Sequence, residues 1–184
     1  MKKSRFSARC MAVTAVLAAM CTVLGGMSLK LGGNFEFTFE SIPVHIGAML
    51  FGPGEGALIG GIGTLIYQVL LSGYGITATT ALWILPYVVC GMVVGLGTRG
   101  AVTARGAKLT LLILAAELSV TLLNTLALYV DSVVYSYYTP VLIFGTLAVR
   151  LVICAAKSVV YAAVLPVLVN RLSAVAILRP AGKR

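Results

Sequence analysis

The sequence contains few charged side chains for its length, and this excludes an ordinary soluble globule. Asp, Glu, Lys and Arg make up 10% of the 184 residues, whereas 60% are hydrophobic and the mean hydropathy is +1.04. Several apolar runs approach the length of about 20 residues that a bilayer span requires. The sequence therefore predicts one integral membrane domain, residues 1–184, with all-α structure.

Acidic residues and histidine are also scarce, and their scarcity excludes most catalytic chemistry. The chain has five Asp and Glu residues and a single histidine, His45. Hydrolases need a nucleophile with an oriented base, and metalloenzymes need clustered ligands. The glycine-rich loop that ends in Lys-Ser or Lys-Thr is missing, so P-loop ATP hydrolysis is excluded. We expect no enzyme activity and no cofactor, and a partner or an ion gradient must power any transport.

The four cysteines show no spacing that is typical of a metal site or a disulfide framework. They are Cys10, Cys21, Cys90 and Cys154, and each lies within an apolar segment. Isolated cysteines in such surroundings behave as small hydrophobic side chains. We therefore expect neither a bound metal nor a disulfide.

Six apolar segments predict a bundle of six transmembrane helices, of which the second is short. The segments are approximately 10–29, 42–51, 57–71, 80–97, 109–129 and 141–169. The sequence Gly52-Pro53-Gly54 separates the second helix from the third, since proline and glycine interrupt helices. The first segment follows basic residues, as in a signal peptide, but it exceeds the usual apolar core of about 7–15 residues. An uncleaved first helix is therefore predicted.

The positive charges predict the orientation of this bundle. Basic residues concentrate at both termini and in the segment 99–108, whereas the connections on the other side carry Glu36, Glu40, Asp131 and only one basic residue, Lys30. Cytoplasmic loops of membrane proteins carry an excess of Lys and Arg. Both termini are therefore predicted to be cytoplasmic.

Two cations in the last apolar segment, Arg150 and Lys157, indicate a binding site. Each costs about 2.5–3.5 kcal/mol near the middle of a spanning helix, so such residues usually face a bundle interior. At about 1.5 Å per residue, Glu117 and Lys157 lie roughly 12 and 18 Å from the cytoplasmic ends, and Asn124 and Arg150 roughly 22 and 28 Å. For Lys157, an ion pair with Glu117 and a ligand contact are equal alternatives. Arg150 with Asn124 favours an anionic or hydrogen-bonding ligand from outside, with snorkelling to the outer surface as the alternative.

Aromatic residues and the histidine extend this candidate site. Phe37 belongs to the alternating aromatic and polar segment 35–40, whose period of two predicts an extended strand with one aromatic face. Tyr74 and Trp83 lie on the same outer side. Such residues favour either an interfacial aromatic belt or stacking against a flat ligand ring. His45 is either a hydrogen-bonded interfacial histidine or a ligand contact.

Three stretches of the sequence resemble the substrate-binding S components of energy-coupling factor (ECF) transporters, most closely the folate-type group. They are the run 42–57, IPVHIGAMLFGPGEGA, the run Leu123-Asn124-Thr125-Leu126, and Arg150 followed by Lys157. The resemblance implies high-affinity capture of a vitamin or related small heterocyclic micronutrient, folate-like molecules included, at a prokaryotic plasma membrane. It also implies delivery through a membrane coupling protein and two cytoplasmic ATPases. Thr64 and Ala127 depart from the folate-type pattern and favour a ligand other than folate.

The same resemblance implies a docking role for small residues in the first helix. Ala12, Ala15, Ala18 and Ala19 have spacings of three and four residues, and Ala15 with Ala19 forms a pair of small residues four apart. In S components an equivalent alanine motif contacts the coupling protein, whereas the alternative is close helix packing within the domain.

Two other functions remain alternatives on the sequence alone. A stand-alone secondary carrier needs a proton or ion relay, for which Glu117 is the candidate. A membrane scaffold subunit that does not transport needs no ligand at all.

Overall fold

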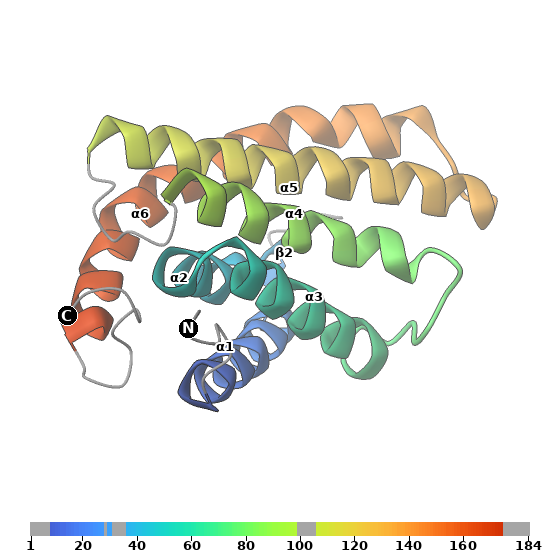
Figure 1. Cartoon of the computed structure of the whole chain (residues 1–184). Coiled ribbons are helices and arrows are strands. Elements are labelled where there is room, and N and C mark those ends of the chain that lie inside the picture. Colours follow the sequence, from blue (N-terminus) through green and yellow to red (C-terminus); the bar gives the residue numbers. More distant parts are fainter. Residues whose placement is uncertain (1–7, 28, 31–35, 99–105, 175–184) are drawn as a thin grey trace.

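Six α-helices, two short strands and one π-helical turn make up the chain that the computed structural model describes, residues 8–27, 29–30, 36–98 and 106–174 (Figure 1). The elements are α1 (Ala8–Gly26), β1 (Leu29–Lys30), β2 (Glu36–Phe37), α2 (Ser41–Phe51), α3 (Pro53–Leu70), α4 (Thr80–Thr98), α5 (Ala107–Val134), η1 (Val141–Gly145) and α6 (Thr146–Ala174). The strands pair antiparallel, with Leu29 opposite Phe37. The prediction of six helices is confirmed. β2 lies within the alternating segment 35–40, for which an extended strand was predicted, whereas its pairing with β1 was not predicted.

The short helix α2 forms the centre of the bundle. It contacts α1, α3, α4 and α6, and all but two of its residues are buried. Its side chains, among them Val44, Met49 and Leu50, join the main hydrophobic core. A helix enclosed in this way is apolar around its whole circumference, which explains why its sequence shows no polar face.

A single glycine joins α2 to α3. Gly52 has φ of 111°, which L-residues with a side chain rarely adopt, and α3 begins at the next residue, Pro53. Proline is favoured in the first turn because its fixed φ suits a helix and its missing N–H would have no helical partner there. The break predicted over Gly52-Pro53-Gly54 is therefore confined to Gly52, and α3 starts before the predicted Ala57.

The helices α3 and α4 approach each other closely because glycines face the contact. A Cβ atom on Gly91 would lie 2.3 Å from the carbonyl carbon of Gly56, and one on Gly60 would lie 2.4 Å from the carbonyl oxygen of Tyr87. Small residues permit such crossings in membrane bundles, where close packing replaces hydrophobic driving force.

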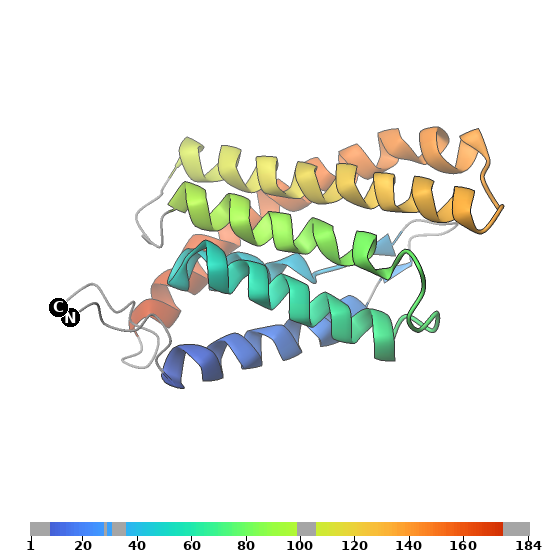
Figure 2. The ribbon, with the colours of Figure 1, turned by 45° about the vertical axis from the view of Figure 1, so that its right-hand side comes forward.

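The ends of the helices gather at two ends of the bundle (Figure 2). The start of α1, the α2–α3 junction, the end of α4, the start of α5 and the end of α6 lie together at one end. The paired strands, the α3–α4 loop and the turn between α5 and η1 lie at the other, which we name the loop end. The start of the first helix and the end of the last helix therefore lie at the same end of the bundle.

Three of the helical segments in the described chain are long and apolar enough to cross a bilayer: Thr80–Thr98, Ala107–Val134 and Val141–Ser173. The apolar segments Cys10–Gly26 and Ser41–Phe51 are shorter. The chain is thus a multi-pass membrane protein by its helices, while the count of six crossings stays a prediction.

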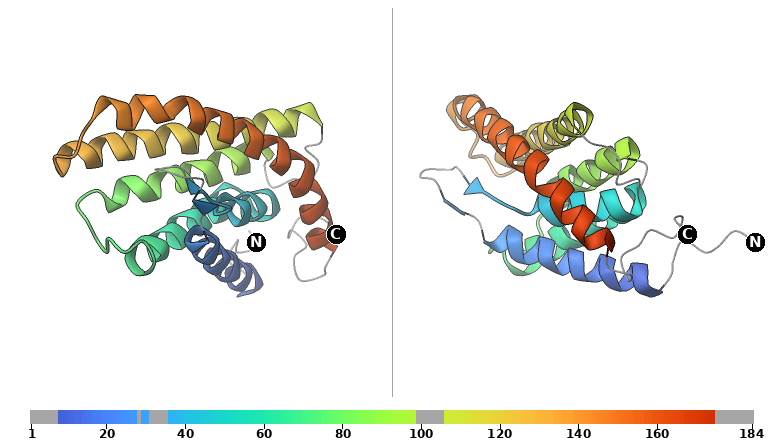
Figure 3. Two further views of the ribbon diagram at one scale, coloured as in Figure 1. Left: turned by 180° about the vertical axis from the view of Figure 1, so that it is seen from behind. Right: turned by 90° about the vertical axis from the view of Figure 1, so that its left-hand side faces the viewer.

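The last helix is not straight. α5 and α6 run side by side, and α6 then bends in its C-terminal part and passes across α2 (Figure 3). Pro166 lies inside that part of α6, and an internal proline removes a helical hydrogen bond. At its other end α6 is preceded by η1, a π-helical turn of the kind that is often found at functional sites.

Candidate functional site

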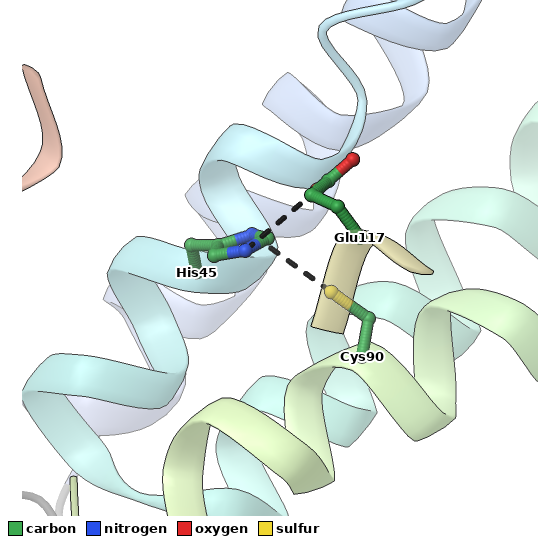
Figure 4. A group of neighbouring side chains, drawn as sticks. All are labelled: His45, Cys90 and Glu117. Carbon is green, nitrogen blue, oxygen red and sulfur yellow. Dashed lines mark hydrogen bonds and ion pairs between the residues drawn. The ribbon is translucent and has the colours of Figure 1, made fainter. Parts of the chain in front are cut away.

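The interior of the bundle contains a cluster of polar side chains from four helices, which we name the inner cluster: His45 on α2, Cys90 on α4, Glu117 on α5 and Lys157 on α6. His45, Cys90 and Glu117 are buried, and Lys157 has a side-chain exposure of 11%. The side chains of Glu117 and Cys90 both approach the His45 ring (Figure 4). These four residues are spread over more than a hundred positions of the sequence, and the fold brings them together.

Lys157 and Glu117 form the ion pair that was one of the two alternatives for Lys157. The Lys157 Nζ lies 3.0 Å from Glu117 Oε2. The ammonium group also lies 5.4 Å from the centre of the Tyr161 ring, within range of a cation–π contact. The charge of each residue is therefore compensated inside the protein, which a buried ion requires.

His45 is enclosed in the bundle and does not lie at an interface. Its Nδ1 lies 2.7 Å from the Ser41 carbonyl oxygen, and its Nε2 lies 3.7 Å from Glu117 Oε1. Its ring meets Tyr161 edge-on, with 5.7 Å between the ring centroids. Its proximity to Pro43 suggested a position near the helix start, and the central place of this helix in the bundle was not predicted.

Arg150 and Asn124 lie farther along the same two helices, and we name them the outer pair. Lys157 and Arg150 are seven residues apart on α6, and Glu117 and Asn124 are seven residues apart on α5. Seven residues are close to two helical turns, about 10 Å, and return to the same face. Because α5 and α6 are antiparallel neighbours (Figure 2), this repeat places the outer pair at one level, toward the loop end.

The outer pair differs from the inner cluster in its partners. Both side chains of the pair are half-buried. Within the described chain, neither Arg150 nor Asn124 has a hydrogen bond or an ion pair. A half-buried guanidinium without a counter-charge is available to bind an anion, and an amide at the same level of the neighbouring helix offers both a donor and an acceptor.

The aromatic residues predicted for the site occupy different positions near the loop end. Trp83 lies near the start of α4 and is partly buried, whereas Tyr74 lies in the α3–α4 loop with 84% of its surface exposed. Phe37 lies on β2, and its side chain lies outside the described part of the structure. The structure therefore leaves a stacking role for these residues as a prediction.

A network around Asp131 joins the loops at this end. Asp131, near the end of α5, accepts hydrogen bonds from Thr79, which directly precedes α4, and from the Tyr137 hydroxyl. Tyr129 and Tyr138 pack edge to face nearby in the chain, with 5.6 Å between ring centroids. Burial first, and then the Asp131 carboxylate, raises the pKa of the Tyr137 phenol above its ordinary value.

Glu40 is a buried acidic residue whose position the sequence did not reveal. It was expected in an outer connection, but it is 3% exposed and accepts a hydrogen bond of 2.8 Å from Thr64 on α3. One signal of this position was present in the sequence: Glu40 directly precedes the apolar segment of α2, and a carboxylate at the start of a helix is favourable.

The small residues predicted for docking lie on the outside of α1. Ala12, Ala15 and Ala19 are exposed, whereas Ala18 is buried against the bundle. Exposed apolar neighbours on the same helix are Met11, Val16, Met20 and Val23. These alanines therefore do not serve internal packing in the described chain, which was the alternative to docking.

Comparison with known proteins gives three findings. A crystal structure of the S-component for biotin from an ECF-type ABC transporter is similar, with a TM-score of 0.66 and 18% sequence identity over 91% of this chain and 92% of that chain. At this identity the similarity concerns the fold. No curated protein matches the sequence. The family described as ECF transporter, substrate-specific component, matches residues 9–178, and the chain therefore belongs to this family of substrate-specific ECF transporter components.

Proposed function

We propose that the chain captures a vitamin or a related small heterocyclic micronutrient that carries an anionic group, and that Arg150 and Asn124 bind it. The observation that carries this proposal is the half-buried Arg150, which has no partner within the described chain. A cation in this position costs about 2.5–3.5 kcal/mol unless something compensates its charge. Glu117, the acidic residue on the facing side of α5, is already paired with Lys157, so the ligand supplies the counter-charge.

The inner cluster forms the base below this ligand site. A ligand contact was one of two alternatives for both Lys157 and His45, and both lie against Glu117 about two turns deeper than the outer pair. In this proposal they set the depth that a ligand reaches, and Arg150 and Asn124 make the polar contacts. Trp83, Phe37 and Tyr74 supply aromatic surface at the loop end.

The orientation of the bundle follows from the positive-inside rule. The end opposite the loop end carries Lys108 and Arg171 among its described residues, and the basic segments 1–9, 99–105 and 179–184 belong to the same side of the predicted topology. We place this end in the cytoplasm of a prokaryotic cell and the loop end outside. The ligand then enters from the outside, on the side of Arg150.

Delivery requires partners in this proposal. The sequence lacks a P-loop, so a membrane coupling protein and two cytoplasmic ATPases provide the energy. The exposed alanines of α1 suit a close contact with a helix of the coupling protein, because small side chains allow two backbones to approach.

The first experiment identifies the ligand directly. The protein is purified in mild detergent after supplementation with a vitamin mixture, and released small molecules are identified by mass spectrometry. We expect an anionic heterocycle with the wild type and none with Arg150→Ala. Arg171→Ala is the matched control, since Arg171 is an exposed arginine on the same helix. If Arg150→Ala retained as much ligand as the wild type and Arg171→Ala, Arg150 would not belong to the site.

A second experiment separates capture from delivery. Replacing Ala15 with Phe is expected to leave ligand binding unchanged and to abolish uptake by cells that contain the coupling protein and ATPases. The buried Ala18 provides the contrast, because Ala18→Phe should lower the stability of the protein itself. Loss of binding in Ala15→Phe would argue against a docking face.

The stand-alone carrier makes an opposite prediction that the same materials test. Liposomes that contain only this chain and a proton gradient should show no uptake if ATPases drive transport. Uptake that depends on the gradient and on Glu117 would instead support the carrier.

A further inference from the structure

Three side chains of the inner cluster carry the donor atoms that transition metals prefer. The nitrogen of His45, the sulfur of Cys90 and a carboxylate oxygen of Glu117 all lie within 4.8 Å of one another. The three residues come from α2, α4 and α5, and all are buried (Figure 4). A set of one nitrogen, one sulfur and one oxygen ligand is typical of sites for Zn²⁺ and similar ions.

Two of the donor atoms face each other without a proton between them. The Ser41 carbonyl can only accept, so the His45 Nδ1, 2.7 Å away, carries the hydrogen. In the neutral imidazole this leaves a lone pair on Nε2, which faces Glu117 Oε1 at 3.7 Å. Within the described chain neither Nε2 nor Oε1 has a hydrogen-bond partner. Buried acceptors without partners are costly, and a cation bound between them would satisfy both.

The surroundings of these two atoms match the support that metal ligands usually have. A metal-binding histidine commonly donates its other N–H to a backbone carbonyl, and a metal-binding carboxylate is commonly held through its second oxygen. His45 is held in this way by Ser41, and Glu117 Oε2 is held by Lys157 at 3.0 Å. The orientation of both ligands is therefore fixed by contacts that leave Nε2 and Oε1 available.

We propose that His45 Nε2, Glu117 Oε1 and Cys90 Sγ bind a Zn²⁺-like ion that ties α2, α4 and α5 together. With bonds of about 2.0–2.3 Å, ligand atoms of a tetrahedral site lie roughly 3.3–3.8 Å apart. The separation of 3.7 Å between Nε2 and Oε1 meets this requirement. Cys90 Sγ lies 3.8 Å from Nδ1 of the same His45 ring, so the Cys90 side chain must shift toward Nε2 when the ion binds.

Charge determines how the ion is bound. Glu117 is already balanced by Lys157, so Cys90 must bind as the thiolate, and its proton is released to the solution. The ion and Lys157 then carry three positive charges against two negative ones, and an anion at the fourth coordination position offsets the difference. Affinity for the ion therefore increases with pH, because the thiol must lose its proton.

The test uses the full chain in detergent, without an affinity tag, and Co²⁺ as the spectroscopic probe. Co²⁺ bound to the wild type should show an absorption band from thiolate-to-metal charge transfer, and added Zn²⁺ should remove it by displacement. In Cys90→Ser the band should be lost and Zn²⁺ affinity should fall about 10- to 100-fold or more. Cys154→Ser, which changes a buried cysteine of α6 outside the cluster, should behave as the wild type.

A second measurement needs no variant and so does not depend on a variant that folds. X-ray absorption of the Zn²⁺-loaded wild type should show one sulfur at about 2.3 Å and nitrogen or oxygen neighbours at about 2.0–2.1 Å. Zinc without a sulfur neighbour, or the same affinity in Cys90→Ser and the wild type, would overturn the metal site and leave an electrostatic cluster. Ligand capture by Arg150 is measured separately, so its failure does not affect this result.

Discussion

Two pairs of residues occupy equivalent positions on α5 and α6, Glu117 with Lys157 at an inner level and Asn124 with Arg150 at an outer level, yet only at the inner level is the charge compensated within the described chain. At the inner level Lys157 meets Glu117 at 3.0 Å. Two turns farther along, Arg150 and Asn124 have no partner within the described chain. The helical repeat is identical at both levels, so the difference lies in the absence of a carboxylate on α5 where Asn124 stands. This contrast suits the proposed function, in which the ligand binds at the outer level and the inner level stabilises the bundle.

The largest expected effect comes from removing a charge from the inner level. Lys157→Met leaves the Glu117 carboxylate buried without its counter-charge, so the free energy of unfolding should fall by about 3–5 kcal/mol. The double variant Lys157→Met with Glu117→Gln removes both charges and should recover most of that loss. Reversible unfolding in detergent or lipid measures both, and an equally unstable double variant would show that the ion pair is not the cause.

At the outer level the same type of change should affect binding and not stability. Arg150→Ala should weaken ligand binding by about 1.5–3 kcal/mol, the value of a hydrogen bond to a charged group. The unfolding free energy of the ligand-free protein should not fall, because Arg150 has no partner to lose within the described chain. Titration calorimetry with the ligand identified by mass spectrometry measures the first quantity. Arg150→Lys should retain part of the affinity, because lysine keeps the charge but loses the planar fork. A large loss of stability in Arg150→Ala would indicate a structural arginine.

Much of this contrast was visible in the sequence because it depends on local features. Apolar runs gave the six helices, the charges of Arg150 and Lys157 marked the helix that faces the interior, and the pairing of Lys157 with Glu117 was one of two alternatives. Distances counted along the helices predicted different depths for Glu117 and Lys157, although the two side chains are in contact. Because α6 bends in its C-terminal part, distance along the helix is not depth in the bundle.

The remaining features could not be predicted because they depend on which helix lies in the middle. The enclosure of α2 turned His45 from a candidate interfacial residue into a fully buried one. The same enclosure brought Cys90, which the sequence predicted as a small hydrophobic side chain, within 3.8 Å of the His45 ring. Glu40 was buried by the start of this helix. A short helix that is apolar on all sides can be buried among other helices or can face lipid, so its pattern does not show that it lies in the centre of the bundle.

The close approach of α3 and α4 helps to position Cys90 in the inner cluster. Gly91, the neighbour of Cys90, leaves no space for a methyl group, since a Cβ would lie 2.3 Å from the carbonyl carbon of Gly56. Gly91→Ala should therefore cost about 1–3 kcal/mol of stability through overpacking. Gly54→Ala is the matched control, because no atom lies within 4 Å of a Cβ there, and it should be neutral or stabilising by up to about 1 kcal/mol. Equal effects of the two variants would contradict a close helix contact.

The smallest expected effect concerns the loop end, beyond the outer pair. Asp131 accepts hydrogen bonds from Thr79 and Tyr137, so Asp131→Asn should lower stability by about 1 kcal/mol, as for a typical hydrogen bond, and leave the inner level unchanged. The pKa of Tyr137 is raised by burial and by the Asp131 carboxylate, so the folded state favours the protonated phenol. Its contribution is complete below the ordinary tyrosine pKa of about 10 and is lost as the pH rises through the higher folded value. Wild type and Tyr137→Phe should therefore differ in unfolding free energy at neutral pH and converge above about pH 10. A difference that stays constant across that range would mean that Tyr137 contributes through packing alone.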